Sequence, residues 1–318
     1  MVMELDHVEA FLAIVRRGGF TRASSSLHLS QPAISRRIGM LERELGAPLF
    51  ERVRSGVLLT EAGRAFLPHA EALLASLRDG VAAVDAVRGA TRGAVGLAVV
   101  GTLASSTLTR CLRRFRDGHP DVDLRLRTAL SAEVSALVRR GDAALGLRYG
   151  LDPDPDLASS VIHDEPLIAV CSAQHRLARA RRVAPAALAG ERWVMFPGRP
   201  GAVREPYSSA LARGLAAIGL DAPDIVPIDS LTGQKRMVEA GFGLALLPES
   251  SIDEELRART LRPLRIQGLR PTIAIALIHR RRAFLGGATR ALIAALTAWP
   301  RRALRRGPAH RLARQALR

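Results

Sequence analysis

The stretch LSQPAISRRIGMLERELG, residues 29–46, predicts a helix with two contrasting faces. One face is apolar at helical spacing and needs a partner to bury it; it consists of Ile34, Ile38, Leu41 and Leu45. Ser30 is a suitable N-cap, Pro32 falls in the first turn, and Gly46 can end the helix in a left-handed conformation. The other face is polar and includes Gly39, which costs about 1 kcal/mol relative to alanine in mid-helix. Such a glycine lets the backbone approach another surface, either protein or DNA.

Two further helices are predicted before this stretch. Apolar residues recur at helical spacing from Leu5 to Val15 until Gly18 and Gly19 stop the first helix. A short second helix follows Thr21, its expected N-cap, and ends at a turn at residues 28–29. Two short helices with a tight turn between them are typical of a helix-turn-helix, whose second helix lies in the major groove of DNA.

The polar face supplies the groups that such a recognition helix needs. Compact hydrogen-bonding side chains read base edges, and arginine binds guanine or phosphate. Gln31, Ser35 and Arg36 provide these groups. Two short extended pieces, residues 48–50 and 57–59, then predict a β-hairpin wing around residues 52–56, with Arg52 and Arg54 placed to reach phosphates or a minor groove.

These residues resemble the winged helix-turn-helix of LysR-type transcriptional regulators. The resemblance covers residues 4–66 and is carried by GGFTRAS, LSQPAISRRIGMLERELGAPLFER and LTEAG. The chain has Ala23-Ser24 where the family commonly has two alanines. The DNA-binding residues that the resemblance implies, together with their neighbour on the helix, are Thr21, Ser30, Gln31, Pro32, Ser35, Arg36, Arg37, Arg52 and Arg54.

A long helix is predicted from Thr60, a fitting N-cap, to about residue 88. Its apolar positions follow a heptad-like seam: Phe66, Ala70, Leu73, Leu77, Val81 and Val84. The partner of this seam is either the same helix of a second subunit or the protein's own core. Dimerisation is the favoured alternative, and the resemblance also implies it. Pro68 is expected to kink the helix or to mark its junction with the wing domain.

Beyond a plausible flexible join at residues 89–93, strands and helices alternate. Strands at 95–100, 122–127 and 143–147 with helices between them predict a βαβαβ unit with a parallel sheet. A proline- and aspartate-rich loop at 152–156 precedes a strand at 167–170. A second set of strands and helices then begins at residue 193 and includes a helix at 234–240. Two similar lobes joined by two crossings predict a hinged module with a ligand in its cleft.

FRDGHPDVDLRL, GDAALGL and VEAGFGLALLP resemble the effector-binding half of LysR-type regulators, which is similar in fold to periplasmic binding proteins. The crossings then lie near 162–172 and 264–278. Hydroxyls and free N–H groups at helix starts favour a small anion, often a carboxylate in this family. The expected effector contacts lie after strands and at helix starts: Gly101, Thr102, Ser131, Tyr149, Phe196, Pro197, Ser230 and Thr232, with Ser230 and Thr232 expected just before the helix at 234–240.

Composition and motifs exclude several classes of protein. The net charge of +17 arises almost entirely after residue 255, where 16 arginines and no acid occur, so net charge alone is weak support for DNA binding.

The two cysteines, Cys111 and Cys171, are expected to be buried apolar residues, with a redox or thiol sensor as the alternative. No catalytic motif and no metal-ligand spacing is found, and no cofactor is expected. The beginning of the chain lacks the pattern of a signal peptide, no apolar stretch approaches the roughly 18 residues of a membrane span, and a cytoplasmic location is expected.

The predicted fold class is therefore mixed. It combines a winged helix-turn-helix (1–59), a linker and dimerisation helix with a hinge (60–92), and a two-lobed α/β effector-binding domain similar to periplasmic binding proteins (93–299). In that domain, 93–161 and 268–299 form the first lobe and 162–267 the second. Residues 300–318 form an arginine-rich tail, expected to be disordered, which we hypothesise adds affinity for DNA phosphates.

The predicted function is sequence-specific regulation of transcription. A homodimer would bind double-stranded promoter DNA and respond to a small-molecule effector. The resemblance also implies homotetramers, activation as well as repression, and recruitment of RNA polymerase, but no membrane partner. The alternative is a cytoplasmic solute-binding or enzymatic α/β protein whose N-terminal helices serve only for assembly.

Overall fold

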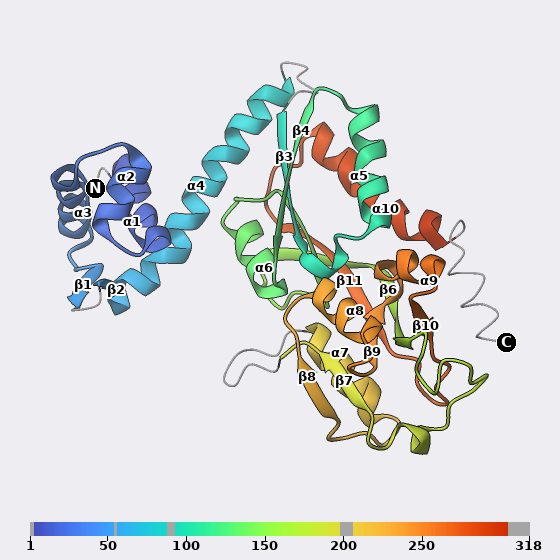
Figure 1. Ribbon diagram of the computed structural model, residues 1–318. Coiled ribbons are helices and arrows are strands. Elements are labelled where there is room, and N and C mark those ends of the chain that lie inside the picture. Colours follow the sequence, from blue (N-terminus) through green and yellow to red (C-terminus); the bar gives the residue numbers. More distant parts are fainter. Residues whose placement is uncertain (1–2, 54–55, 88–92, 198–205, 305–318) are drawn as a thin grey trace. The chain divides into compact units, whose positions relative to one another are not determined.

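The computed structural model describes residues 3–53, 56–87, 93–197 and 206–304. The chain forms two compact units, Met1–Val84 with Arg139–Asp142 and Asp85–Val138 with Ala143–Arg318. The first contains the N-terminal helices and hairpin, and the second contains the large α/β part (Figure 1).

Three helices and a two-stranded antiparallel hairpin build the N-terminal unit. They are α1 (Leu5–Arg17), α2 (Phe20–Leu27), α3 (Gln31–Leu45), β1 (Phe50–Val53) and β2 (Gly56–Leu59). Their apolar faces meet in one core around Phe11, Ile34 and Leu41, all fully buried. The predicted helix-turn-helix followed by a wing is confirmed.

Left-handed residues end the first three helices. Gly46 (φ 69°) takes this conformation as predicted, and Gly18 (φ 70°) takes it where the sequence predicts the end of the first helix. His28 takes the same conformation after α2 (φ 55°). The expectation that Thr21 caps α2 is wrong, because Phe20 already belongs to the helix and Gly19 occupies the N-cap position. The Phe20 ring packs against Phe50 in the core, with ring centroids 5.8 Å apart, and this contact holds the first residue of the helix in place.

The long helix α4 spans Glu61–Val87 and continues through Pro68 as a single helix. Only the first part of its apolar seam packs into the protein's own core. Phe66 and Ala70 pack into the core of the N-terminal unit. The later seam positions are about half exposed, between 46% and 58%: Leu73, Leu77, Val81 and Val84. The second half of the seam is therefore left uncovered by the described part of the chain.

The first lobe of the C-terminal unit contains the predicted parallel βαβαβ arrangement. Strand β3 (Gly93–Val100) lies between β4 (Val122–Ala129) and β5 (Leu145–Tyr149) and pairs with both in parallel. The helices α5 (Ser106–Gly118) and α6 (Ser131–Arg139) connect these strands. The expected flexible join falls mostly on residues 88–92, outside the described residues, and Gly93 itself begins β3.

One long strand, β6 (Leu157–Ser172), links the two lobes. Its first part pairs antiparallel with β11 (Thr272–Arg280), which also pairs with β5. Its last part pairs with β9 (Ala245–Pro248) and β10 (Leu261–Pro263) in the second lobe. The sequence predicted a strand only at 167–170, because the preceding residues are largely polar and their partner β11 lies more than 100 residues further along the chain.

The rest of the second lobe is built on β7 (Arg192–Met195) and β8 (Asp224–Pro227), which pair in parallel. A bridge between Trp193 and Leu244 joins this pair to the strand region at β9. The helices are α7 (Pro206–Ala216), α8 (Leu231–Glu239) and α9 (Asp253–Ala258). Short 3-10 helices also occur: η1 (Gly101–Leu103), η2 (Pro185–Leu188) and η3 (Glu249–Ser251).

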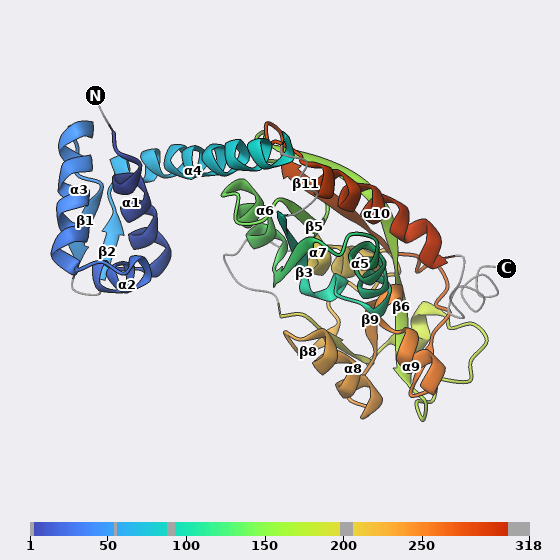
Figure 2. The ribbon, with the colours of Figure 1, turned by 90° about the horizontal axis from the view of Figure 1, so that it is seen from above.

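Helix α10 (Gly287–Leu304) lies beside α5, and both cover the sheet of the first lobe (Figure 2). The arginine-rich tail was expected to be disordered from residue 300, but α10 continues through Leu304. Residues 305–318, which hold most of that tail, lie outside the described residues. No helix in the described ranges is long and apolar enough to cross a membrane.

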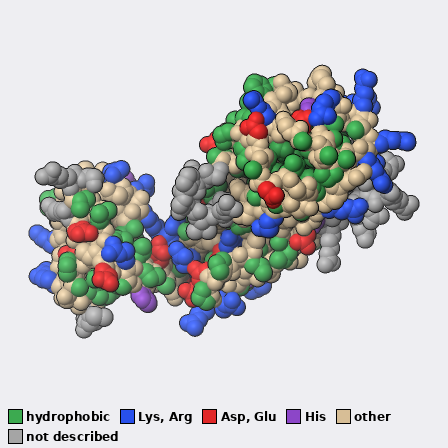
Figure 3. Space-filling view, turned by 90° about the horizontal axis from the view of Figure 1, so that it is seen from below, with side chains coloured by type: hydrophobic (Ala, Val, Ile, Leu, Met, Phe, Trp, Pro, Cys, Tyr) green, Lys and Arg blue, Asp and Glu red, His purple; other side chains and the backbone are tan. Residues whose placement is uncertain are grey.

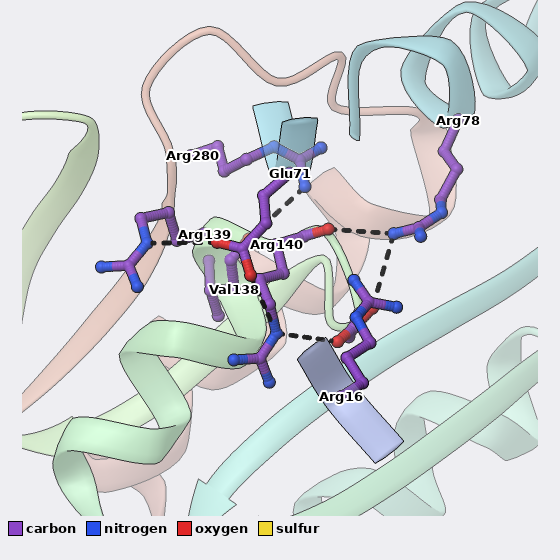
Figure 4. Close-up of polar contacts among 8 residues, drawn as sticks. Arg16, Glu71, Arg78, Val138, Arg139, Arg140 and Arg280 are labelled. Atoms are coloured by element: carbon purple, nitrogen blue, oxygen red, sulfur yellow. Dashed lines mark hydrogen bonds and ion pairs between the residues drawn. The ribbon is translucent and has the colours of Figure 1, made fainter. Parts of the chain in front are cut away.

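The end of β11 is tied to the end of α6 within the first lobe. Arg280 Nη1 donates to the carbonyl oxygen of Val138 at 3.4 Å (Figure 4). One residue beyond α6, Arg140 Nε also forms an ion pair with Asp142 Oδ2 at 3.1 Å.

Candidate functional site

Helix α3 buries one face and leaves the other accessible, as its sequence pattern predicts. Ile34, Ile38 and Leu41 are buried in the core of the N-terminal unit. Ser30 Oγ accepts a hydrogen bond from the Ala33 amide at 3.3 Å and caps the helix. The outward side chains at its start are then held by a fixed helical backbone.

The predicted groove residues occupy this outward face. Gln31, Pro32 and Arg36 are exposed, and Ser35 is half-buried. On the face of the molecule drawn in Figure 3, basic side chains stand at the left edge of the N-terminal unit, where Figures 1 and 2 place α3. An accessible helix that carries an amide, a hydroxyl and a guanidinium fits the edges of base pairs and their phosphates.

Arg37 differs from its neighbour Arg36 in direction. Its Nη2 atom forms an ion pair with Asp6 Oδ2 on α1 at 2.7 Å. This contact ties α3 to α1 and occupies part of the guanidinium. The sequence placed Arg37 among the DNA-binding residues without recognising this structural partner.

A carboxylate on α3 sets the position of the wing. Glu42 Oε1 accepts hydrogen bonds from the amides of Leu49 at 2.7 Å and Phe50 at 3.3 Å, where β1 begins. The Phe50 ring packs against Phe11, with ring centroids 5.2 Å apart. The wing is therefore fixed to both α3 and α1, and sequence reasoning did not identify Glu42 as the residue responsible.

The other end of the hairpin is held by the start of α4. Thr60 Oγ1 accepts from the Gly63 amide at 3.0 Å, which confirms Thr60 as the N-cap, and donates to the Pro48 carbonyl at 2.6 Å. Gly63 lies against the wing backbone, because a Cβ atom there would come within 2.2 Å of the Leu49 carbonyl oxygen. Residues 60–63 therefore hold the start of α4 against the wing.

Of the two wing arginines, the structure describes the backbone of Arg52 but not Arg54. Arg52 was expected in the hairpin tip, but it belongs to β1, opposite Val57, because the strands pair up to Val53 and Gly56. Arg54 lies outside the described residues, so its predicted role stays a prediction.

Predicted effector residues from both lobes meet in an aromatic cluster. The Thr102 hydroxyl donates to Tyr149 Oη at 3.0 Å. The Tyr149 ring stacks on Tyr207 of α7, and the Phe196 ring meets Tyr207 edge-on, with centroids 5.3 and 5.4 Å apart. Tyr207 Oη donates to the Leu246 carbonyl at 3.1 Å. The cluster thus joins the first lobe to the second, and Tyr207 is a member that the sequence analysis missed.

Tyr149 is less accessible than expected. The sequence placed it after the third strand, but it is the last residue of β5 and is fully buried. The strand extends this far because it pairs with β11 up to the Tyr149–Ile275 position. In this conformation Tyr149 contacts Thr102 and Tyr207 and exposes no surface of its own.

The remaining predicted effector residues lie at ends of strands and helices. Gly101 begins η1, Ser131 is buried at the first residue of α6, and Pro197 follows β7. Ser230 caps α8 by accepting from the Gly233 amide at 3.3 Å. Thr232 was expected before this helix but lies inside its first turn, because the Ser230 cap starts α8 at Leu231.

A buried carboxyl on the linking strand was also missed by the sequence analysis. Glu165 is 3% exposed, and its Oε1 accepts from the Ser250 amide of η3 at 2.8 Å. Burial raises the pKa of Glu165 to about 7. His163 lies 3.6 Å away, from Nε2 to Glu165 Oε2, and burial lowers its pKa. A single acid among polar strand residues carries no sequence signal that would reveal this burial.

Lys235 connects α8 to the 3-10 helix η3 and to α9. Lys235 Nζ on α8 lies 2.6 Å from Glu255 Oε1 and donates to the Ser251 carbonyl at 3.1 Å. Lys235 is the only lysine of the chain. This contact fixes the segment that faces Glu165.

An open cavity of about 410 Å³ lies elsewhere in the second lobe and contains none of the predicted residues. It is lined by His175, Gly190, Glu191, Arg192 and residues 240–243. His175 Nε2 and Glu191 Oε2 lie within hydrogen-bond distance at 3.1 Å, and Glu191 Oε1 forms an ion pair with Arg176 at 2.6 Å. These polar groups thus satisfy one another.

The chain offers no exposed thiol. Cys111 and Cys171 are both buried, as expected. Burial raises the pKa of Cys171 to about 11, which keeps it as the unreactive thiol at neutral pH. Among the residues that the structure describes, no group of three or more metal-ligating side chains occurs.

Comparison with known families and proteins agrees with this geometry. Residues 5–64 match the family described as bacterial regulatory helix-turn-helix protein, lysR family. Residues 88–301 match the LysR substrate binding domain.

Curated relatives match almost along their whole length. The RuBisCO operon transcriptional regulator of Allochromatium vinosum is 30% identical over 282 residues, which cover 88% of this chain and 91% of that protein. The HTH-type transcriptional regulator BudR of Raoultella terrigena is 32% identical over 284 residues, covering 86% and 94%.

Solved structures share the fold. A full-length OxyR variant from Pseudomonas aeruginosa has a TM-score of 0.69 at 19% identity, covering 94% of this chain and 97% of that one. Full-length CbnR, in a complex with its target DNA, has a TM-score of 0.62 at 24% identity, covering 93% and 100%.

Proposed function

Because the chain belongs to the LysR family of DNA-binding transcriptional regulators with an effector-binding domain, we propose that the outward face of α3 reads its operator directly. The observation that carries this proposal is the accessible row of Gln31, Ser35 and Arg36 on a helix whose opposite face is buried. Arg36 binds a guanine or a phosphate in the groove, and the wing binds the DNA backbone beside it. Ser30, Thr21 and Arg52 lie nearer the phosphates.

Replacing Arg36 tests this proposal without disturbing the core. Arg36→Ala should weaken specific binding by about 1–3 kcal/mol, roughly 5- to 150-fold, and leave folding and oligomeric state unchanged. Arg114→Ala is the matched control, because it removes an exposed arginine from α5 in the other unit. Equal DNA affinity of both variants and the wild-type protein would contradict the role of Arg36. Loss of the oligomer in Arg36→Ala would instead favour the rival interpretation as an assembly module.

We propose that the second half of α4 pairs with the same helix of a second subunit. Four aliphatic side chains at heptad-like spacing, Leu73 to Val84, are about half exposed, and a helix of this length exposes too much apolar surface if it stays alone. Leu77→Asp should dissociate the dimer in light scattering. Ala72→Asp adds the same charge to the opposite side of α4 and should leave the dimer intact. Dissociation by neither variant would refute this pairing.

We propose that a small carboxylate binds between the two lobes near Thr102, Ser131 and Ser230. The support is that Thr102 contacts an aromatic cluster contributed by both lobes and that Ser131 and Ser230 carry hydroxyl groups at helix starts. A panel of mono- and dicarboxylates should contain a compound that raises the unfolding temperature of the C-terminal unit. The shift should shrink in Thr102→Val. A shift that is unchanged in Thr102→Val would place the compound elsewhere.

We further propose that two such dimers form a tetramer that contacts two half-sites and that the effector changes DNA bending and thereby the access of RNA polymerase. The protein then acts in the cytoplasm, where its DNA target is, and it has no catalytic role. A gel-shift bending assay with and without the bound carboxylate tests this proposal. An identical bend angle in both states would contradict it.

A further inference from the structure

The fold of the chain does not explain why position 39 of α3 is a glycine. It lies in the middle of the helix, where glycine is less favourable than any residue except proline. It does not have the positive φ that would require a glycine. A residue that weakens its own helix needs an explanation in packing or in binding.

The packing explanation fails at this position. A Cβ atom at Gly39 would meet no other atom within 4 Å. At other glycines the reason is internal, because a Cβ at Gly63 would meet the Leu49 carbonyl and one at Gly146 would meet Ile278 at 2.7 Å. Packing within the described part of the chain therefore does not require a glycine at position 39.

The position of Gly39 on α3 places it beside the proposed reading face. At 3.6 residues per turn, Gly39 lies about 40° around the helix from Ser35 and about 60° from Arg36. It thus falls between two residues of the proposed reading face, one turn further along. The buried positions Ile34 and Ile38 lie about 140° and 100° around the helix from Gly39.

A hydrogen bond between Arg43 and Gly39 also supports an approach of DNA to this position. Arg43 Nε donates to the Gly39 carbonyl at 3.1 Å, which holds an exposed guanidinium beside the bare backbone. An arginine held in this way presents its terminal N–H groups to an anion that approaches Gly39.

We propose that Gly39 is a DNA-contact position, at which the missing side chain lets the backbone of α3 approach the DNA while Arg43 binds a phosphate next to it. This proposal rests on the proposed function of α3 and extends its DNA-contacting face by two turns. Its consequence is a trade-off, in which a side chain at position 39 improves the helix and impairs the interface.

The test uses the full chain and the tightest duplex that the wild-type protein selects from a random DNA pool. Gly39→Ala should raise the hydrogen-exchange protection of α3 amides about fivefold, because alanine favours the helix. It should nevertheless weaken binding to the selected duplex by at least about fivefold, as overpacking of a close contact does, and Gly39→Leu should weaken it further.

Two further variants complete the test. Gly118→Ala, at the end of α5, also adds a methyl group that meets nothing within 4 Å, and it should leave DNA affinity unchanged. Arg43→Ala should weaken binding and reduce the slope of log affinity against log salt by about one unit.

The outcomes separate this inference from the proposed function. Unchanged affinity of Gly39→Ala, or lower protection of its α3 amides, would overturn the inference even if Arg36→Ala loses binding. Failure of the wild-type protein to select any sequence would overturn the proposed function itself.

Discussion

Replacing Gly63 by alanine inserts a methyl group into space that the wing already occupies. The new Cβ atom would lie 2.2 Å from the Leu49 carbonyl oxygen and 2.8 Å from Leu59 Cδ2. The nearer of these atoms belongs to the backbone and cannot rotate away. The wing therefore has to move away from α4.

The cost of that movement follows from the contacts of Leu49. Overpacking costs about 1–3 kcal/mol. Displacing Leu49 also weakens its bonds to Glu42 and to the Thr60 amide, each worth about 1 kcal/mol. Alanine stabilises the helix by about 1 kcal/mol relative to glycine, which offsets part of this cost. Gly63→Ala should then lower the opening free energy of the wing by about 2–4 kcal/mol.

Amide hydrogen exchange of the full chain measures this quantity segment by segment. Exchange of the wing amides, residues 47–60, should accelerate at least about 30-fold in Gly63→Ala. Gly39→Ala is the matched control within the same unit, because its Cβ atom meets nothing, and its α3 amides should exchange more slowly than in the wild type. Wing protection in Gly63→Ala equal to or above that of the wild type would refute the reasoning.

Two further predictions concern buried groups of the C-terminal unit. Because burial raises the pKa of Glu165 from 4.5 to about 7, its ionisation destabilises the folded state increasingly as pH rises through this range. Glu165→Gln should therefore gain stability relative to the wild type in urea unfolding, by up to about 3 kcal/mol between about pH 5 and pH 8, and a difference independent of pH would contradict this. Both cysteines are buried, so peroxide at levels that oxidise exposed thiols should leave DNA binding unchanged, and Cys111→Ser with Cys171→Ser should bind DNA as the wild type does. A peroxide response that this double variant loses would revive the redox-sensor alternative.

The N-terminal elements were largely predictable because their signals are local. Ser30, Gly46 and Thr60 each end or start a helix through a bond within a few residues, and the structure confirms all three. The apolar spacing of α3 likewise settled which face is buried. Even here the prediction of Thr21 as the N-cap of α2 was wrong, because the packing of Phe20 against the wing joins residues that are distant in the sequence.

The region where the two lobes meet was less predictable because its structure depends on pairings between distant residues. Strand β6 owes its full length to β11 and β9, and Tyr149 is buried because β5 also pairs with β11. The roles of Glu42 and Glu165 depend on which backbone amides the fold brings to their carboxylates. No pattern along the chain distinguishes these two acids from exposed ones.

Footprinting of the purified full chain on the DNA upstream of its own gene, at near-physiological salt, tests the central claim most directly. The account predicts protection of a dyad whose half-sites lie one helical turn or a multiple apart, and loss of that protection in Arg36→Ala. Salt-sensitive binding without any protected site, unchanged by Arg36→Ala, would mean that the basic C-terminal segments supply the affinity and would contradict sequence reading by α3.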